Sequence, residues 1–368
     1  MKPAGGVTVA VTMEQLWHRV PGGTATATLG MVNALATRDD VELIGVAARH
    51  ARPPEPSFRT RIAIKQLPLP RSALYETWHL LRGPRVQRAT GPVDVVHATT
   101  LAVPPPSAPL VVTIHDLAFM DRPQDFTRRG MRLFTRGLEL ARRDAALVLC
   151  PSQTTKNDCI AHGFDPERVD VVPWGVAAIA PPPQTQIRAR FGLERAFVLW
   201  TGTIEPRKNL PVLLDAFSTL DHDVDLVLAG PQGWKQDLGA RISSDPRVRS
   251  VGFVDPATLA GLYAAADAFC YPSLKEGFGL PVLEAMAQGA PVITSQGTST
   301  EEVGGDAVLL VDPRDVNAVA AALESVLDDH DLARSLSNAG RRRAATFTWD
   351  RTAGLVAAAY RRVVGAGP

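Results

Sequence analysis

Short apolar runs alternate along this chain with longer segments of helical or irregular patterning. Apolar runs of about four to eight residues, bounded by turn residues, are typical of buried strands. The first set of runs lies at 6–12, 41–48, 93–98, 110–116, 146–152 and 168–175, and the second at 196–202, 224–230, 248–254, 267–273, 290–295 and 307–312. Strands that alternate with helices predict parallel sheets. We therefore expect an α/β protein with two Rossmann-like, doubly wound domains.

The segment 177–186 separates the two sets of strands. It contains three consecutive prolines and has no periodicity, which is typical of a linker. We place the first domain at 1–172, the second at 173–350, and a helical carboxyl-terminal segment at 351–368. Ligands of such sheets bind beyond the carboxyl ends of the strands. A site is therefore expected in a cleft where the carboxyl ends of both sheets face each other.

Composition narrows the class of protein. The chain has 368 residues, of which 45% are hydrophobic and 21% charged, as is ordinary for a globular protein. No stretch approaches the ~18 apolar residues of a membrane span, and the first apolar run is too short for a signal peptide. We expect a cytoplasmic protein. Its three scattered cysteines fit reduced, buried thiols better than a disulfide framework.

Charge is distributed unevenly between the two halves. Residues 1–172 carry 21 Lys and Arg against 16 Asp and Glu, whereas residues 173–368 carry 18 against 22. The excess concentrates in 122–144, a predicted helix with seven arginines. This helix is either a solvated element with its apolar stripe in the core, or a surface for peripheral contact with anionic lipid at the inner face of a membrane. Nucleic acid is not expected as a partner, because basic and aromatic residues do not interleave.

The stretch "LKEGFGLPVLEAMAQGAPVITS" (274–295) joins two predicted strands through a glycine-containing loop and a helix. Pro281 suits the first turn of that helix, because the N–H that proline lacks has no partner there. We therefore expect a helix from Pro281 to Gln288. A loop at a strand's carboxyl end, followed by a helix amino terminus, is suited to bind a phosphate or the oxygens of a sugar.

The stretch "VLWTGTIEPRKNLPVLLDAF" (198–217) has a similar arrangement. A strand ends near Gly202, Arg207 and Lys208 stand side by side, and an amphipathic helix begins near Asn209. Arg binds phosphate oxygens in pairs and Lys supplies a mobile point charge, so the loop suits a pyrophosphate. Taken alone, two cations before a helix are more often a solvated turn. Together with the Glu276 loop in the same sheet, the pyrophosphate reading is favoured.

These two stretches carry a family resemblance. "GTIEPRKNL", followed about seventy residues later by "EGFGLPVLEAMAQGAPVI", resembles family 4 of the retaining glycosyltransferases, which have the GT-B fold. The most specific feature is the pair Glu276 and Glu284, separated by seven residues with "GFGLP" between them. The resemblance extends over nearly the whole chain and implies a nucleotide-sugar donor bound mainly by the second domain.

The resemblance also implies roles for residues of the second domain. Arg207 and Lys208 would neutralise the diphosphate leaving group, and Glu276 would hold hydroxyls of the donor sugar. Glu284 would bind the ribose. The backbone of Phe278, Gly279 and Leu280 would assist Glu276, Gly202 would lie at the phosphates, and the nucleobase would lie near Gly252, Phe253 and Val254.

The first domain is expected to bring the acceptor and one polar group to the sugar. Gly22 and Gly23 open a predicted helix and would let its backbone approach a ligand closely. His115 and Asp116 end a predicted strand; the resemblance implies that His115 contacts the donor sugar, and a core histidine is the competing reading. Asp116 is a candidate acceptor-side base or orienting residue. His97 is expected to be structural.

The resemblance implies a retaining enzyme, and no nucleophilic carboxylate is evident. We expect a front-face displacement in which the leaving phosphate helps to deprotonate the acceptor. Fixed cations would stabilise the charge that develops on the phosphate, so no metal or other cofactor is expected. The clusters "DHD" (221–223) and "DDH" (328–330) fall at expected helix ends or loops. Glu276 and Glu284 are not expected to act as a glycosidase pair.

Donor and acceptor are less constrained than the reaction. The loops most resemble those of bacterial mannosyltransferases, which makes GDP-mannose the first choice; a UDP-sugar or dTDP-rhamnose also fits. Expected acceptors are a glycan, a lipid-linked oligosaccharide or a small glycoside. A noncatalytic nucleotide-sugar-binding scaffold of the same fold is the alternative function. A nucleotide-dependent oxidoreductase is disfavoured, because no G-x-G-x-x-G with an acidic residue ~20 positions later follows a strand.

Overall fold

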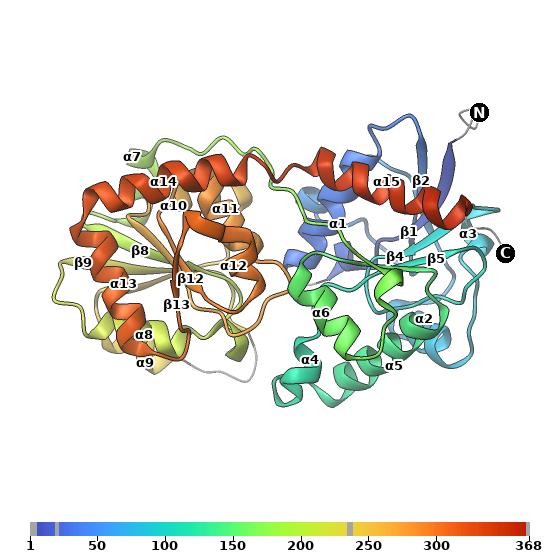
Figure 1. Cartoon of the computed structure of the whole chain (residues 1–368), viewed down its shortest axis with the longest axis horizontal. Coiled ribbons are helices and arrows are strands. Elements are labelled where there is room, and N and C mark those ends of the chain that lie inside the picture. Colours follow the sequence, from blue (N-terminus) through green and yellow to red (C-terminus); the bar gives the residue numbers. More distant parts are fainter. Residues whose placement is uncertain (1–5, 19–21, 234–237, 366–368) are drawn as a thin grey trace. The chain divides into compact units, whose positions relative to one another are not determined.

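The computed structural model of the chain describes residues 6–18, 22–233 and 238–365. The chain divides into two compact units, one made of Met1–Gly175 with Thr348–Pro368 and the other of Val176–Phe347. We call them the first and second unit. Each unit has one parallel sheet covered by helices on both faces (Figure 1), which confirms the prediction of two Rossmann-like α/β domains.

The first unit contains a seven-stranded sheet with the order β3-β2-β1-β4-β5-β6-β7, in which every pair is parallel. Its strands are β1 (Val7–Thr12), β2 (Val41–Ala47), β3 (Ile64–Gln66), β4 (Val95–Ala98), β5 (Leu110–Thr113), β6 (Leu147–Cys150) and β7 (Val169–Val171). Six of them lie within predicted runs. The sequence did not predict β3, because this edge strand has only three residues and two of them are polar and exposed.

Seven α-helices of the first unit are described: α1 (Gly22–Leu35), α2 (Arg71–Leu80), α3 (Gln87–Thr90), α4 (Ala118–Asp121), α5 (Arg128–Asp144), α6 (Gln153–Ala161) and α15 (Trp349–Gly365). Two apolar layers flank the sheet. Val9 and Val11 face the layer that contains α1 and α15, whereas Ala10 between them faces the layer of α2 and α5. This alternation follows from the period of two in a strand.

The helix α15 packs against α1 within the first unit. Gly30 of α1 makes this contact possible, because a Cβ at that position would overlap the indole ring of Trp349. Tyr360 of α15 is completely buried, and its hydroxyl lies 2.7 Å from His97 Nδ1 on β4. The terminal helix is therefore joined to the sheet by both apolar packing and a buried hydrogen bond.

The second unit contains a six-stranded parallel sheet with the order β10-β9-β8-β11-β12-β13. Its strands are β8 (Ala196–Thr201), β9 (Val224–Ala229), β10 (Val248–Gly252), β11 (Ala268–Tyr271), β12 (Val292–Ser295) and β13 (Leu309–Val311). The described helices are α7 (Gln184–Phe191), α8 (Leu210–Ser218), α9 (Gly239–Ser244), α10 (Pro256–Ala265), α11 (Leu280–Gln288), α12 (Ser299–Gly304), α13 (Val316–Asp328) and α14 (His330–Ala344).

Strand order reverses at one place in each sheet. The neighbours β1 and β4 mark the reversal in the first unit, and β8 and β11 mark it in the second. Loops that leave two such neighbours turn to opposite faces of the sheet, which opens a crevice at their carboxyl ends. The "TIEPRKN" loop follows β8 and the Glu276 loop follows β11. The fold therefore brings these two distant stretches of sequence together.

The chain passes from the first unit to the second between Gly175 and Val176, and returns between Phe347 and Thr348. The proline-rich segment 177–186, expected to be a linker, belongs to the second unit. Its last residues form the first turn of α7, which Pro183 precedes at the cap position. Gln288 of α11 donates to Ile179 O at 2.9 Å and fixes the segment. The segment thus follows the crossing point directly and leads into α7.

Candidate functional site in the second unit

The loop after β8 holds two cations in a short 3-10 turn, η5 (Pro206–Lys208). Asn209 ends this turn in the left-handed conformation, with φ of 56°, which asparagine tolerates better than most residues. Its side-chain amide donates to Pro272 O at 3.0 Å and to Pro313 O. The turn is therefore tied to the loops that follow β11 and β13, and α8 begins at Leu210 as predicted.

The loop after β11 presents Glu276 and is shaped by Gly279. The φ angle of Gly279 is +104°, and a Cβ there would lie 2.8 Å from Thr300 Cγ2. Only glycine fits this close approach. The helix α11 starts immediately afterwards, at Leu280, one residue before the predicted start. Phe278 and Leu280 are buried, and the Phe278 ring packs on Phe347 with 5.9 Å between centroids.

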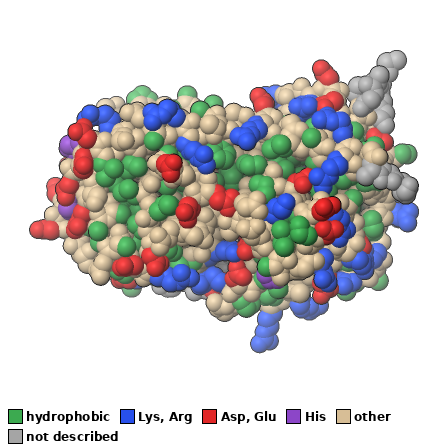
Figure 2. Space-filling model, viewed as in Figure 1, with side chains coloured by type: hydrophobic (Ala, Val, Ile, Leu, Met, Phe, Trp, Pro, Cys, Tyr) green, Lys and Arg blue, Asp and Glu red, His purple; other side chains and the backbone are tan. Residues whose placement is uncertain are grey.

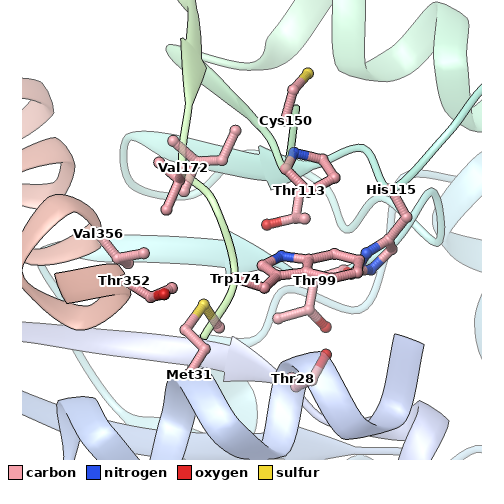
Figure 3. Close-up of a pocket in the computed structure, with 12 residues that line it drawn as sticks. Thr28, Met31, Thr99, Thr113, His115, Cys150, Val172, Trp174, Thr352 and Val356 are labelled. Carbon is pink, nitrogen blue, oxygen red and sulfur yellow. The ribbon is translucent and has the colours of Figure 1, made fainter. Parts of the chain in front are cut away.

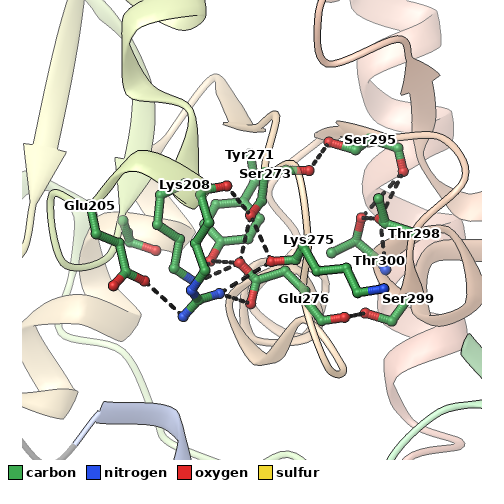
Figure 4. A network of polar contacts seen from close by, with 12 residues as sticks. Glu205, Lys208, Tyr271, Ser273, Lys275, Glu276, Ser295, Thr298, Ser299 and Thr300 are labelled. Carbon is green, nitrogen blue, oxygen red and sulfur yellow. Dashed lines mark hydrogen bonds and ion pairs between the residues drawn. The ribbon is translucent and has the colours of Figure 1, made fainter. Parts of the chain in front are cut away.

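Glu276 and the two cations meet in one cluster, in which Lys208 and Glu276 are buried and Arg207 is partly exposed (Figure 4). Lys208 Nζ lies 2.6 Å from Glu276 Oε1, and Arg207 Nη1 lies 2.9 Å from Glu276 Oε2. The second terminal nitrogen of Arg207, Nη2, lies 2.8 Å from Glu205 Oε1. The structure therefore brings Arg207, Lys208 and Glu276 together, although 68 residues separate Lys208 from Glu276 in the sequence.

Neutral side chains complete the environment of the cluster. Ser273 donates to Glu276 Oε1 at 2.6 Å, and the hydroxyl of Tyr271 donates to the same oxygen at 3.0 Å. Lys208 Nζ donates to the Tyr271 hydroxyl and lies 5.0 Å from the centre of its ring. The buried carboxylate thus has hydrogen bonds as well as ion pairs, which is what a charge removed from water requires.

The ion pairs determine the charge of Glu276. Burial alone would raise its pKa, but the charges of Arg207 and Lys208 outweigh burial and lower the pKa to about 2. Burial, with Arg207 nearby, lowers the pKa of Lys208. Glu276 is therefore ionised at neutral pH, and Lys208 loses its proton more readily than an exposed lysine.

Glu284 lies on α11 in a different environment from Glu276. Burial raises its pKa to about 7, and its Oε2 accepts a hydrogen bond of 3.3 Å from the Tyr263 hydroxyl. Tyr263 is also 3.0 Å from Thr201 Oγ1 at the end of β8. The two glutamates of the sequence signature therefore differ in charge state, and the protonation of Glu284 changes close to neutral pH.

Glycines form the edge of the site at the ends of β8, β9 and β10. A Cβ on Gly230 would overlap the carbonyl of Gly202, so the two strand ends meet backbone to backbone. Gly230 N donates to Gly252 O at 2.8 Å. Gly202, Gly230 and Gly252 have φ angles of +136°, +147° and +68°. Next to Gly252, Phe253 is 69% exposed and Val254 is partly buried.

The first unit has its own pocket at the carboxyl ends of its strands, where Thr28, Thr99, Thr113, His115 and Trp174 are among the lining residues (Figure 3). His115 Nε2 lies 2.8 Å from Thr99 O and therefore carries the proton. Its Nδ1 is buried and has no hydrogen-bond partner within the part of the chain that the structure describes. Burial lowers the pKa of His115, so the ring is neutral.

Three further observations bear on the predicted residues of the first unit. Asp116 Oδ1 accepts from Ala118 N at 3.0 Å and so caps the turn that leads into α4. Gly22 and Gly23 are exposed and form the first turn of α1, as predicted; residues 19–21 of the predicted loop lie outside the described residues. His97 is completely buried between the Tyr360 hydroxyl and Thr113 Oγ1, at 2.7 and 2.8 Å, in agreement with a structural role.

Several residues of these two sites were not predicted. Gln15 donates to Thr28 Oγ1 and Thr99 Oγ1 at 2.5 and 2.7 Å, and both threonines line the pocket of the first unit. Trp174 packs on His115 with ring centres 5.1 Å apart. In the second unit Glu205 and Tyr271 were missed. Their positions carry a signal, because each lies within a few residues of the carboxyl end of β8 or β11, where ligands bind.

The two sequence clusters with metal-like composition do meet, because His222 Nε2 lies 2.9 Å from Asp328 Oδ1. Across residues 6–18, 22–233 and 238–365, however, no group of three or more His, Cys, Asp or Glu side chains is arranged to hold a metal ion. Helices long and apolar enough to cross a bilayer are also absent from these ranges.

Comparison with known proteins supplies the identity of the fold. Residues 21–178 match the family described as Glycosyltransferase Family 4, and residues 184–343 match the family described as Glycosyl transferases group 1. The O-antigen chain mannosyltransferase B of Escherichia coli is 32% identical over 274 residues, which cover 70% of this chain and 71% of that protein.

Two more proteins extend the comparison. The MMP alpha-(1->4)-mannosyltransferase of Mycolicibacterium hassiacum is 30% identical over 348 residues, which cover 85% of this chain and 82% of that protein. Anabaena HepE, solved in complex with UDP and glucose, is similar in fold, with a TM-score of 0.75 at 19% identity over 97% of this chain and 100% of that one. The chain therefore belongs to glycosyltransferase family 4 and has the GT-B fold of two Rossmann-like domains.

Proposed function

We propose that this glycosyltransferase transfers a sugar, with retention of configuration, from a nucleotide-sugar donor to an acceptor hydroxyl. The observation that carries this proposal is the buried cluster of Arg207, Lys208 and Glu276 beside the crevice between β8 and β11. Departure of the nucleotide leaves negative charge on its phosphate, and cations held in place before the reaction stabilise that charge without reorganisation.

The charged residues then bind different parts of the donor. Arg207 and Lys208 bind the diphosphate, Glu276 accepts hydrogen bonds from hydroxyls of the donor sugar, and Glu284 accepts from the ribose. Backbone groups of Gly202, Phe278, Gly279 and Leu280 assist, and the nucleobase lies near 252–254. Because the two cations supply the positive charge at the leaving group, we propose that the reaction needs no metal or other cofactor.

The first unit supplies neutral polar groups. His115 is the candidate for contact with the transferred sugar, because its buried Nδ1 can accept a hydrogen bond from a hydroxyl. Gly22, Gly23 and Asp116 remain candidates for acceptor contacts. In a front-face displacement the leaving phosphate takes the acceptor's proton, so no side chain has to act as nucleophile.

GDP-mannose is the donor we favour, because two of the compared relatives are mannosyltransferases. HepE was solved with UDP and glucose, so a UDP-sugar is the second candidate, followed by dTDP-rhamnose. Acceptors of the expected chemistry are a glycan end, a lipid-linked oligosaccharide or a small glycoside.

The test is to incubate the purified protein with each donor, with and without small mannosides and glucosides, and to measure nucleoside diphosphate release. GDP release that depends on the acceptor, with the anomeric configuration of the product retained by NMR and no loss in EDTA, is expected. Donor binding by calorimetry without turnover on any acceptor would favour the noncatalytic scaffold. An inverted product would remove the proposed stereochemistry.

We also propose peripheral contact with an anionic membrane through the surface of α2 and α5. The apolar face of α5 is in the core, as predicted, where Leu138 is buried. Arg128, Arg129 and Arg132 of α5 are exposed, and Figure 2 shows Lys and Arg side chains gathered over this part of the first unit. Beside them, at the end of α2, Leu80 and Leu81 are 69% and 77% exposed. Basic side chains around exposed apolar ones suit a surface of anionic lipid.

Vesicle sedimentation tests this contact. We expect binding to vesicles that contain phosphatidylglycerol and little binding to phosphatidylcholine alone. The double variant Leu80→Gln, Leu81→Gln should bind less, whereas Leu310→Gln, which changes an exposed leucine of β13 in the second unit, should bind as the wild type does. Equal binding by both variants would contradict the proposed surface.

A further inference from the structure

Glu205 is the charged residue of the 205–208 loop to which the proposed reaction gives no task. It lies four residues after the last residue of β8 and precedes Pro206, and its side chain is only 6% exposed. Its Oε1 lies 2.8 Å from Arg207 Nη2, while Glu276 Oε2 lies 2.9 Å from Arg207 Nη1 (Figure 4). The guanidinium of Arg207 is therefore held between two carboxylates.

The two cations of the cluster are not equally accessible. The side chain of Arg207 is 21% exposed and that of Lys208 is 10% exposed. Lys208 is also covered by Tyr271 and Glu276. A diphosphate that enters from solvent therefore meets Arg207 first, and it meets a guanidinium whose field is already offset by Glu205.

We infer that Glu205 is a positioning residue that holds Arg207 and weakens its grip on the diphosphate, so that the nucleoside diphosphate product can leave. This inference rests on the proposed function. A carboxylate that pairs with a phosphate-binding guanidinium in a partly buried site lowers the affinity for the phosphate by about tenfold. Two cations and two carboxylates also leave the four side chains without net charge when all are ionised.

The Glu205 carboxylate repels the nucleoside diphosphate product more than the nucleotide-sugar donor. In the transfer, the bond between the anomeric carbon and the phosphate oxygen breaks, a bond from that carbon to the acceptor oxygen forms, and the acceptor's proton passes to the phosphate and then to water. The released nucleoside diphosphate then carries one negative charge more than the nucleotide sugar did. A fixed carboxylate beside Arg207 therefore favours exchange of product for a new donor.

Glu205→Gln is the direct test, because it removes the charge and keeps an oxygen that can accept from Arg207. We expect GDP and UDP to bind about tenfold more tightly to this variant by isothermal titration calorimetry, with the same fall in the product-inhibition constant. The salt dependence of binding should become steeper, which loss of a merely structural contact would not cause. Asp331→Asn is the matched control: it changes an exposed carboxylate of the second unit that lies 3.0 Å from Arg334, and it should not alter affinity.

A double-mutant cycle with Arg207→Ala locates the effect. The gain from Glu205→Gln should persist or grow in the Arg207→Ala background, because the Glu205 carboxylate then repels the phosphates without the screening of its guanidinium partner. Unchanged or weaker binding by Glu205→Gln overturns the inference, even when Arg207→Ala and Lys208→Ala both lose affinity as the proposed function requires. If neither of these two variants loses affinity, the proposed diphosphate site itself is wrong.

A second variant covers the case in which Glu205→Gln does not fold. Glu205→Asp keeps the charge but withdraws the carboxylate from Arg207 by one methylene group. We expect a smaller gain in nucleoside diphosphate affinity, about threefold, from the weakened ion pair. Affinity equal to that of the wild type would overturn the inference.

Discussion

The polar residues around the candidate sites of the two units differ in kind. In the second unit, Arg207, Lys208 and Glu276 form ion pairs of 2.6 and 2.9 Å in a buried cluster. In the first unit, Gln15 and Thr99 are joined by neutral hydrogen bonds, and burial keeps His115 neutral. Both sheets have the same strand order around the reversal point, so the fold alone does not determine this difference.

The difference indicates which ligand each unit suits. A charged cluster at a strand edge stabilises a ligand whose charge grows during the reaction, because the charges of the cluster are in place before the reaction starts. Neutral donors and acceptors suit hydroxyl groups, which carry no charge to offset. On the proposed function, the second unit binds the diphosphate and the first binds hydroxyls. Substitutions in the two units should therefore differ in size and in their response to pH.

The largest effect is expected from Lys208→Ala. Loss of the buried ammonium removes charge stabilisation at the leaving group and leaves Glu276 with one cation fewer, so kcat/KM should fall by about a thousandfold. Acceptor-dependent release of nucleoside diphosphate is the measurement, with thermal unfolding to show that the variant folds. Lys65→Ala, which changes an exposed lysine of β3, is the control. Near-wild-type turnover in Lys208→Ala would remove the charged site from the reaction.

A smaller effect is expected from His115→Ala in the first unit. The variant removes one neutral hydrogen-bonding group, for which a loss of about a hundredfold in kcat is reasonable. KM for the donor should change little, because the diphosphate contacts remain. The exposed His330 of α14 provides the control variant His330→Ala. If His115→Ala changed KM rather than kcat, the histidine would serve binding and not the chemical step.

The architecture was well predicted from the sequence, because strands and helices follow from local patterns of apolar and polar residues. All but one of the thirteen strands that the structure describes lie in apolar runs, and the start of α11 follows from Pro281 and the glycine before it. The pairing of Arg207 and Lys208 with Glu276 was also reachable, because a doubly wound sheet brings successive strand ends to one edge. The structure adds the distances.

What the sequence did not predict depends on contacts between distant residues. The paired glutamates look alike in the sequence, yet two cations lower the pKa of Glu276 to about 2 whereas burial raises that of Glu284 to about 7. Gln15 was missed because no local pattern separates a buried, bonded polar side chain from a solvated one. The proline segment 177–186, expected to be a linker, also contains the start of α7, because prolines favour both linkers and helix starts.

An effect of intermediate size is expected from substitution of Glu284. It compares how the stability contributions of the two glutamates respond to pH. Its pKa is about 7 in the folded chain and 4.5 in the reference state, so the folded chain holds the proton more tightly. Its contribution to stability is complete below about pH 4.5 and is lost as pH rises through 7. Relative to Glu284→Gln, the wild type should lose about 2 kcal/mol of unfolding free energy between pH 4.5 and 8. This figure is smaller than the full pKa shift would give, because Glu284 is only partly buried and solvent screens its charge.

Urea unfolding of both proteins across this pH range measures the difference. For Glu276 we expect the opposite dependence of stability on pH. Its pKa is lowered in the folded chain, so its contribution to stability is present above about pH 4.5 and is lost as pH falls toward 2. Parallel stability curves for wild type and Glu284→Gln would show that Glu284 is not buried enough to titrate near neutrality, and the contrast between the two glutamates would fail.

The smallest effect is expected from Tyr360→Phe, which tests whether the first unit depends on neutral hydrogen bonds. The variant keeps the apolar packing of α15 but removes the hydroxyl that lies 2.7 Å from His97 Nδ1. Because burial lowers the pKa of His97 to about 3, the ring stays neutral and loses one hydrogen bond without gaining a charge. A buried polar atom left without its partner costs about 1 to 3 kcal/mol. Urea unfolding should show a loss in this range that is unchanged between pH 5 and 8, and a loss that grew toward pH 5 would mean that His97 takes up a proton and that the first unit also stores charge in its core.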